Sequence, residues 1–403
     1  MKSYKEVQKL SEFELKQIKD KYLKMITIIV LTLHLLALIA LIFSTPWKWD
    51  FALLEFFSKG LDYEVVKWWS RTYELAGDSE VAIFYVCSWM IILESIFKWL
   101  VQRSENNIFK KHKYVIKLVY LIVLSTWVVW VVRTINNQFK FVNDFERHWD
   151  IVFWDKIHYR QILNVIIPIN QTIILAICFY WIHFKLARRE EFLTNRYWLG
   201  AIKVIVLGLI TSVVILIKGL TSRPFYINVV FGDLLKQLDN DQQKHIIDYY
   251  KDQTHYRYGF LDQSANSINQ YISNAFGEFK EWPWYRFNGF FNPSIHTNQF
   301  NTIHSWAFPS GHTSATIMGG FAIFTLFKHD KYITLKKIIA SFIYLLHLLS
   351  MSFALVVTRG HWVSDVAFSY VLVILILIIG EKVFNKINYW IDIKFSNKVI
   401  TDN

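Results

Sequence analysis

Residues 363–383 read VSDVAFSYVLVILILIIGEKV, and this stretch decides the class of fold. Its central part, residues 366–380, contains no charged side chain. About 20 apolar residues wound as a helix are long enough to cross the hydrocarbon core of a bilayer. The stretch therefore predicts a membrane-spanning helix and an integral membrane protein.

Apolar blocks of similar length recur along the rest of the chain. Because a segment inside a bilayer must satisfy its own backbone hydrogen bonds, each block is predicted to be a helix. The eight predicted spans are 25–45, 81–101, 114–133, 162–184, 198–219, 308–327, 338–358 and 363–383. The predicted fold class is all-α, a polytopic transmembrane helical bundle of about eight spanning helices.

The composition agrees with this prediction. Of 403 residues, 54% are hydrophobic and 18% aromatic against 19% charged, which is typical of neither a disordered nor a soluble chain. Cys87 and Cys178 both lie in apolar blocks, so neither a disulfide framework nor a thiolate metal site is expected. The first block is not followed by a small-residue cleavage site, which favours an uncleaved anchor over a signal peptide.

The net charge of +12 is concentrated in short segments between the apolar blocks. We interpret these lysines and arginines as topology signals and as contacts to anionic lipid, and we expect no nucleic-acid partner. An even number of spans puts both termini on one side, and the basic clusters make that side cytoplasmic. The expected location is the bacterial cytoplasmic (inner) membrane, although an internal membrane with a lumenal site would obey the same rule.

The segments on the opposite side are longer and rich in Trp and Tyr, namely 46–80, 134–160 and 221–307. Aromatic-rich amphipathic pieces of this kind are expected to lie on the membrane surface. Within the longest segment, 229–250 and 264–279 have helical apolar spacing.

Some polar residues inside the spans have simple structural explanations. Glu94 and Lys98 are four residues apart, so we expect them to pair with each other. His183 and His347 each stand alone on an apolar helix, where a catalytic role is not expected.

Three other segments place phosphate-binding or proton-transferring side chains at the ends of spans, on the non-cytoplasmic side. The first runs from Lys218 to Pro224, KGLTSRP, where the span 198–219 ends. Lys218 offers a point charge and Arg223 a planar fork, the usual pair for holding a phosphoryl group. The alternative is that both side chains simply extend to the membrane surface at a helix end.

The second segment is Pro309-Ser310-Gly311-His312, where the span 308–327 begins. A helix start with Pro, a Ser hydroxyl and a Gly that permits close approach forms an anion site from backbone N–H groups and the helix dipole. An ordinary helix start would explain the Pro and the Ser, but not the adjacent Gly-His pair.

The third segment runs from Thr358 to Asp365, TRGHWVSD, at the turn into the last span. If the helix has begun, His361 and Asp365 share a face because they are four residues apart. The carboxylate then holds one imidazole nitrogen as N–H and leaves the other as a nucleophile. The alternative is a capped helix start.

Together these segments resemble the type 2 phosphatidic acid phosphatase superfamily, membrane lipid phosphatases related to vanadium haloperoxidases. Pro-Ser-Gly-His at 309–312 matches completely, and 360–365 closely follows the family's Gly-x-His-Trp-x-Ser-Asp ending. The resemblance covers roughly 114–383. It implies a six-helix lipid-phosphatase core within 114–403, with a long non-cytoplasmic segment 221–307, preceded by an N-terminal region 1–113 with two extra transmembrane helices.

The resemblance also implies the roles of the residues. His361 would attack phosphorus to give a phosphohistidine, Asp365 would orient it, and His312 would protonate the leaving oxygen and later activate water. Phosphate-binding roles are implied for Lys218, Arg223, Ser310, Gly311 and Arg359. No metal and no cofactor are expected, because fixed cations supply the electrostatic stabilisation.

Two arginines depart from the family pattern. The family places six residues between the Lys and the Arg-Pro of its first motif, whereas four residues separate Lys218 from Arg223 here. The family also places an Arg six residues before the nucleophile, where this chain has Leu355. Arg359 lies one helical turn later on roughly the same face, from which it could reach the same phosphate.

The leading hypothesis is an enzyme that hydrolyses a phosphomonoester or diphosphate from a lipid headgroup at the non-cytoplasmic face. Phosphatidic acid, phosphatidylglycerophosphate, polyprenyl diphosphates and lipid A phosphates are candidate substrates. One alternative is a lipid phosphotransferase that uses the same phosphohistidine, and another is a non-catalytic lipid-phosphate binder or transporter. A haloperoxidase is not expected, because those relatives are soluble. The expected partners are the lipid phosphate and the bilayer.

Overall fold

The computed structural model describes residues 12–103, 111, 114–144, 157–221, 223, 225–226, 307–330 and 332–401. These residues are largely helical and contain no strand. The main helices are α1 (Glu12–Ser44), α2 (Trp47–Ser58), α3 (Glu64–Arg103), α5 (Tyr114–Asp144), α7 (Ile157–Trp181), α8 (Tyr197–Thr211), α9 (Val213–Thr221), α13 (Gly311–His329), α14 (Leu335–Val357) and α15 (Val363–Thr401). The prediction of an all-α polytopic bundle is confirmed, and the chain is an integral membrane protein.

Seven helical stretches in the described part of the chain are long and apolar enough to cross a membrane. They correspond to seven of the eight predicted spans. The predicted span 308–327 forms α13, which is not among the seven because hydroxyl-bearing residues, glycines and a histidine lower its hydropathy. Since α13 packs against α3, α8, α14 and α15, it is shielded from lipid by other helices. The predicted helical segments 229–250 and 264–279 lie outside the described residues.

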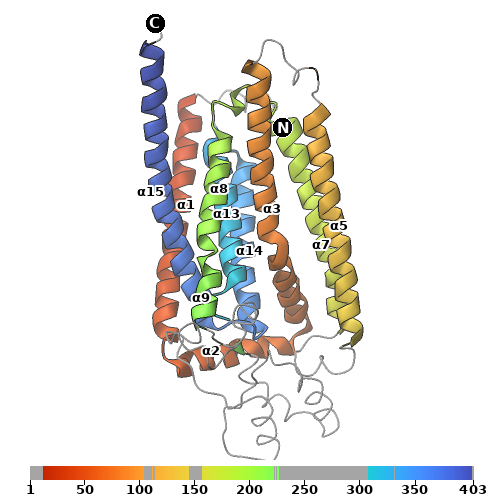
Figure 1. The fold of residues 1–403 in the computed structure, drawn as a ribbon. Helices are drawn as coiled ribbons and strands as arrows, with labels where there is room; N and C mark the ends of the chain where they lie inside the picture. Colours follow the sequence, from red (N-terminus) through yellow and green to blue (C-terminus); the bar gives the residue numbers. More distant parts are fainter. Residues whose placement is uncertain are drawn as a thin grey trace, which may run out of the picture.

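The long helices run side by side, and α1 begins at the end of the bundle where α15 finishes (Figure 1). Helix α1 packs along α15, whereas α3 packs against α7, α8, α13 and α14. The two N-terminal spans therefore contact helices of the C-terminal part directly. The division of the chain at residue 113 stays a prediction.

Helix α2 lies across the opposite end of the bundle (Figure 1). It begins after Pro46 and carries Asp50 in its first turn, where a negative charge is favourable at the positive end of the helix dipole. Leu54 is fully buried in the main apolar cluster, while Trp49 and Phe56 on the same helix are exposed. This amphipathic helix covers the end of the bundle that holds the predicted site.

The predicted span 198–219 is broken between α8 and α9 at Ser212. The Ser212 hydroxyl donates to the Gly208 carbonyl at 3.1 Å, and the Thr211 hydroxyl donates to the same carbonyl at 2.8 Å. Hydroxyl groups that bond back to the preceding turn compete with the helical ladder and bend it. The short helix α9 after this break carries Lys218 to the end covered by α2.

The prediction that Glu94 and Lys98 pair with each other is wrong. Glu94 instead bonds His183 Nδ1 at 2.6 Å, and the Lys98 ammonium donates to the carbonyls of Ala187 and Arg189 at 3.1 and 2.6 Å. The cause is the turn of π-helix that follows α7 at Ile182–Leu186. The chain then turns away and leaves backbone carbonyls without helical partners, which a lysine can satisfy.

Candidate active site

The three sequence segments predicted to form the site meet beneath α2. The Ala307 N–H donates to the Arg223 carbonyl at 2.8 Å, which joins the first segment to the second. The Ser310 N–H donates to the Asp365 carbonyl at 3.3 Å, which joins the second to the third. Backbone hydrogen bonds thus fix the three segments relative to one another.

The pair formed by His361 and Asp365 lies where α14 ends and α15 begins. The His361 N–H donates to the Leu355 carbonyl at 2.9 Å, and Nδ1 of the imidazole lies 3.4 Å from Asp365 Oδ2. The same carboxylate oxygen accepts the Trp362 N–H at 2.9 Å. A carboxylate facing Nδ1 keeps the proton on that nitrogen and leaves Nε2 with its lone pair. The 3.4 Å separation is long, as is common in sites without substrate.

The protonation state of His361 follows from its surroundings. Burial lowers the pKa of His361 to about 4; the hydrogen bond to Asp365 opposes this, while the nearby charges of Lys218 and His312 add to it. The imidazole is therefore neutral at neutral pH, the state that a nucleophile requires. These electrostatic effects also place Lys218, His312 and His361 in one neighbourhood.

The amino-terminal end of α13 forms the second part of the site. Ser310 is the N-cap, and its hydroxyl accepts the Thr313 N–H at 3.4 Å and the Thr313 hydroxyl at 3.0 Å. Gly311 and His312 are the first helical residues, so the positive end of the α13 dipole lies beside them. A Cβ on Gly311 would lie 3.9 Å from the Lys218 Cε, an ordinary van der Waals distance, so the Lys218 side chain lies beside the first residue of α13.

Phe225 occupies a position where the family pattern would place the motif's arginine. Its ring meets the His361 ring edge to face, with centroids 5.3 Å apart. The Lys218 ammonium lies 5.8 Å from the centre of the same ring. Phe225 therefore packs against both the predicted nucleophile and the predicted phosphate-binding lysine.

Arg223 is buried and bonded to two carboxylates. Its Nη1 lies 2.7 Å from Asp365 and 2.5 Å from the Ser364 hydroxyl, and its Nη2 lies 3.0 Å from Asp50. The guanidinium also stacks over the Trp362 ring at 4.5 Å. The phosphate-binding role of Arg223 stays a prediction, and the contacts described here are to other side chains.

Arg359 adopts a left-handed backbone conformation, with φ of 62°, directly after α14. Such a conformation often ends a helix, and here Gly360 follows it. Burial lowers the pKa of Arg359, and the charges of Tyr226 and Asp62 oppose this shift. Arg359 is thus near Tyr226, whose ring packs against Trp362 at 5.2 Å. Its role toward phosphate stays a prediction.

Asp50 is a member of the site that the sequence did not reveal. It lies 173 positions from Arg223 in the chain, and the only local signal is a single acidic residue in an aromatic stretch. Gly77 on α3 was also missed: a Cβ there would overlap the His312 ring, so the helix can approach this histidine only with glycine.

A buried polar cluster lies deeper in the bundle, around Glu80 on α3. Its carboxylate accepts the Thr316 hydroxyl at 3.0 Å, bonds His347 Nε2 at 3.0 Å and accepts the Tyr344 hydroxyl. His347, predicted to stand alone, therefore has an acidic partner. Among the described residues, no group of three or more His, Cys, Asp or Glu side chains is arranged to hold a metal ion.

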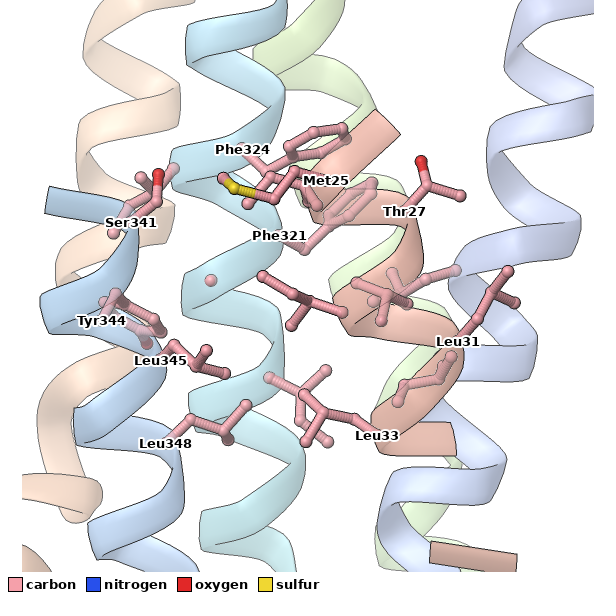
Figure 2. Close-up of a pocket in the computed structure, with 18 of the residues that line it drawn as sticks. Met25, Thr27, Leu31, Leu33, Phe321, Phe324, Ser341, Tyr344, Leu345 and Leu348 are labelled. Carbon is pink, nitrogen blue, oxygen red and sulfur yellow. The ribbon is translucent and has the colours of Figure 1, made fainter. Parts of the chain in front are cut away.

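An apolar chamber of about 390 Å³ lies between α1, α13, α14 and α15. Met25, Leu33, Phe321 and Leu348 are among the side chains that surround it (Figure 2). The His361–Asp365 pair is not in its lining. Because α1, α14 and α15 are long and apolar enough to cross a membrane, the chamber lies largely within the apolar part of the protein.

Fold and site together define an integral membrane protein with a histidine–aspartate site at one end of a helical bundle. The chain belongs to the PAP2 superfamily, whose family model matches residues 199–389 and so includes every predicted site residue. Membership and the apolar helices identify a membrane phosphatase in general terms.

A related chain gives no further functional detail. An uncharacterized protein of Mycoplasma capricolum subsp. capricolum is 37% identical over 362 residues, which cover 88% of this chain and 92% of that protein. The similarity extends well beyond the region that matches the family model. No solved structure matches the chain significantly.

Proposed function

We propose that the protein removes a phosphoryl group from a phosphomonoester or diphosphate lipid headgroup through a phosphohistidine on His361. The observation that carries this proposal is the buried His361–Asp365 pair beside Lys218 and the amino-terminal end of α13. The neutral imidazole of His361, the Lys218 ammonium and the positive end of the α13 dipole then lie close together. This combination suits attack on an anionic phosphorus centre.

In the proposed reaction, Lys218 and the N–H groups of the first turn of α13 hold the phosphoryl oxygens. Nε2 of His361 attacks phosphorus, the new N–P bond forms as the P–O bond to the lipid breaks, and His312 gives a proton to the departing oxygen. Asp365 stabilises the positive charge on the imidazole. A water molecule then loses a proton to His312 and attacks phosphorus, which releases phosphate and restores His361.

The apolar chamber supports a lipid as the substrate. Ile317 and Tyr370 line it, and each lies five positions beyond a predicted catalytic residue, His312 on α13 and Asp365 on α15. At 1.5 Å per residue, the chamber starts about 8 Å deeper in the bundle than the site. This apolar volume lies at the depth in the bundle that the hydrocarbon chain of a bound lipid phosphate would reach. The four lipid classes named above remain the candidate substrates.

The proposed orientation has both termini in the cytoplasm and the site at the outer face of the bacterial cytoplasmic membrane. The basic residues Arg103, Arg189 and Lys328 belong to the clusters that favour this topology, because lysine and arginine accumulate on the cytoplasmic side. Helix α1 begins and α15 finishes at one end of the bundle, and the site lies at the other (Figure 1).

The test measures phosphate release from the four lipid classes by the protein in detergent, with a chelator present, for the native chain and for His361→Gln. The matched control is His329→Gln. His329 lies on α13 away from the site, and its Nδ1 bonds the Asn195 carbonyl at 2.8 Å. We expect release by the native chain and by His329→Gln, and an acid-labile phosphoenzyme that is absent from His361→Gln.

Other outcomes assign other functions. Phosphate that appears only on an added acceptor lipid would make the protein a phosphotransferase. If the native chain and His361→Gln both bind lipid but release no phosphate, the protein is a non-catalytic binder and hydrolysis is excluded.

A further inference from the structure

Asp50 connects the surface helix α2 to the predicted nucleophile through a continuous set of buried contacts. Its carboxylate is fully buried and lies 3.0 Å from Arg223 Nη2. It also accepts the Ser364 hydroxyl, and the Ser364 N–H at 3.3 Å. Arg223 in turn lies 2.7 Å from Asp365, which faces His361.

The position of α2 is fixed independently of these polar contacts. Leu54 is fully buried in the main apolar cluster, and the Phe51 ring packs against Tyr226 at 5.3 Å. The helix also packs against α1, α14 and α15. The packing of α2 therefore holds Asp50 beside Arg223.

The charges in this network explain what Asp50 does there. Two buried carboxylates, Asp50 and Asp365, share one guanidinium, which donates to both through different nitrogens. A buried charge is tolerated when it is paired and hydrogen-bonded. Without Asp50, Arg223 would have Asp365 as its only acidic partner in the network. The Arg223 guanidinium would then attract the Asp365 carboxylate more strongly and turn it away from the His361 imidazole.

We propose that Asp50 is a positioning residue of the active site, which holds Arg223 so that Asp365 stays aligned with His361. The inference rests on the proposed phosphatase function. It assigns a role to the segment before residue 199, where the match to the family model begins. In this arrangement Arg223 organises the nucleophile, and Lys218 with the α13 amino-terminal end holds the phosphate.

The test compares Asp50→Asn with Glu55→Gln, an exposed carboxylate on the same helix. Asparagine keeps the size of Asp50 and an acceptor for the Ser364 N–H, but it removes the charge opposite Arg223. We expect kcat for phosphate release to fall about 30-fold with KM within about threefold, because orientation of the nucleophile is lost and phosphate binding is not. Glu55→Gln should match the native chain in both constants.

Two further variants keep the inference falsifiable. If Asp50 acts through Arg223, then adding Asp50→Asn to Arg223→Gln should cost less than about threefold more in kcat, since coupled residues are not additive. Should Asp50→Asn fail to fold, Ser364→Ala removes one contact of Asp50 and should lower kcat about fivefold at unchanged KM.

The outcomes separate the inference from the proposed function. If Asp50→Asn keeps the native kcat and KM while His361→Gln is inactive, the role of Asp50 is overturned and the proposed phosphatase function stands. Additive losses in the double variant, or a loss confined to KM, would also overturn it. A native chain that is silent on every lipid would overturn both.

Discussion

Two of the histidine–carboxylate pairs in the described part of the chain differ sharply in their surroundings. In one pair, His361 Nδ1 lies 3.4 Å from Asp365, at the end of the bundle covered by α2. In the other, His183 Nδ1 lies 2.6 Å from Glu94, between α3 and the π-turn after α7. By distance alone, the second pair is the better hydrogen bond.

The neighbours of each pair make the difference. His361 and Asp365 have Lys218, Arg223 and the amino-terminal end of α13 close by. His183 instead contacts the rings of Tyr120 at 5.2 Å and Phe184 at 4.6 Å. A histidine–carboxylate pair becomes a candidate catalyst where cations and helix dipoles can stabilise a phosphoryl group. The pair among aromatic rings is suited to holding helices together.

The largest expected effect comes from exchanging each carboxylate for its amide. Asp365→Asn should lower kcat by about 10³-fold or more, because the imidazole loses both its orientation and the charge that stabilises it. Glu94→Gln should leave kcat within about threefold, measured per folded molecule by phosphate release. A comparable loss in Glu94→Gln would show that the His183 pair takes part in the reaction.

Two lysines inside the bundle provide the next comparison, the half-buried Lys218 and the buried Lys203. Lys218→Met should lower kcat/KM about 10²-fold, because a fixed charge beside the phosphoryl group is lost. Lys203 on α8 lies 2.6 Å from Glu381, away from the site. Lys203→Met should therefore lower the thermal midpoint by several degrees while leaving kcat/KM nearly native. If both variants lose activity equally, Lys218 stabilises the fold and does not act on the phosphoryl group.

The sequence predicts the parts of this arrangement that depend on local spacing. Apolar blocks predict the spanning helices, and the four-residue separation of His361 and Asp365 predicts that they meet. They do meet, at 3.4 Å, although His361 lies in the turn before α15 begins at Val363 and not on a face of that helix. The amino-terminal end of α13 was predicted from Pro309, Ser310 and Gly311, although Pro309 lies before the Ser310 N-cap and not at the first helical position. These features need only neighbouring residues to be read.

Other features depend on residues that are distant in the chain. Asp50 meets Arg223 only because α2 folds across the end of the bundle, and no pattern in 46–80 indicates a partner so far away. For the same reason Glu94 was assigned to Lys98, although His183 reaches it across the bundle. Spacing along a helix predicts which residues share a face, but not what packs against that face.

A smaller effect is expected from the ring that packs on the nucleophile. Phe225→Leu removes the edge-to-face contact with His361, and such aromatic contacts contribute about 0.5–1.5 kcal/mol. We expect kcat to fall up to about tenfold, measured with the same lipid. Phe57→Leu on α2 is the control, because the Phe57 ring packs against Phe353 and not against a site residue. Native kcat in Phe225→Leu would mean that the ring does not help to orient His361.

The smallest expected effect near neutral pH concerns the protonation of His361. Burial lowers its pKa to about 4, with the hydrogen bond to Asp365 opposing and the charges of Lys218 and His312 adding to the shift. Attack requires the neutral imidazole, so protonation of His361 should not reduce kcat/KM until the pH falls to about 4. Below that value, the rate should fall about tenfold per pH unit.

The lipid phosphate also titrates, so two substrates whose phosphates ionise at different pH are needed. A limb that belongs to His361 stays at the same pH with both substrates, whereas a limb from the substrate moves. A shared limb near the ordinary histidine pKa of about 6.5 that is retained in the residual activity of His312→Gln would mean that water reaches the His361 imidazole. The buried pair at the α14–α15 turn would then be open to solvent, and its distinction from the His183 pair would rest on the neighbouring cations alone.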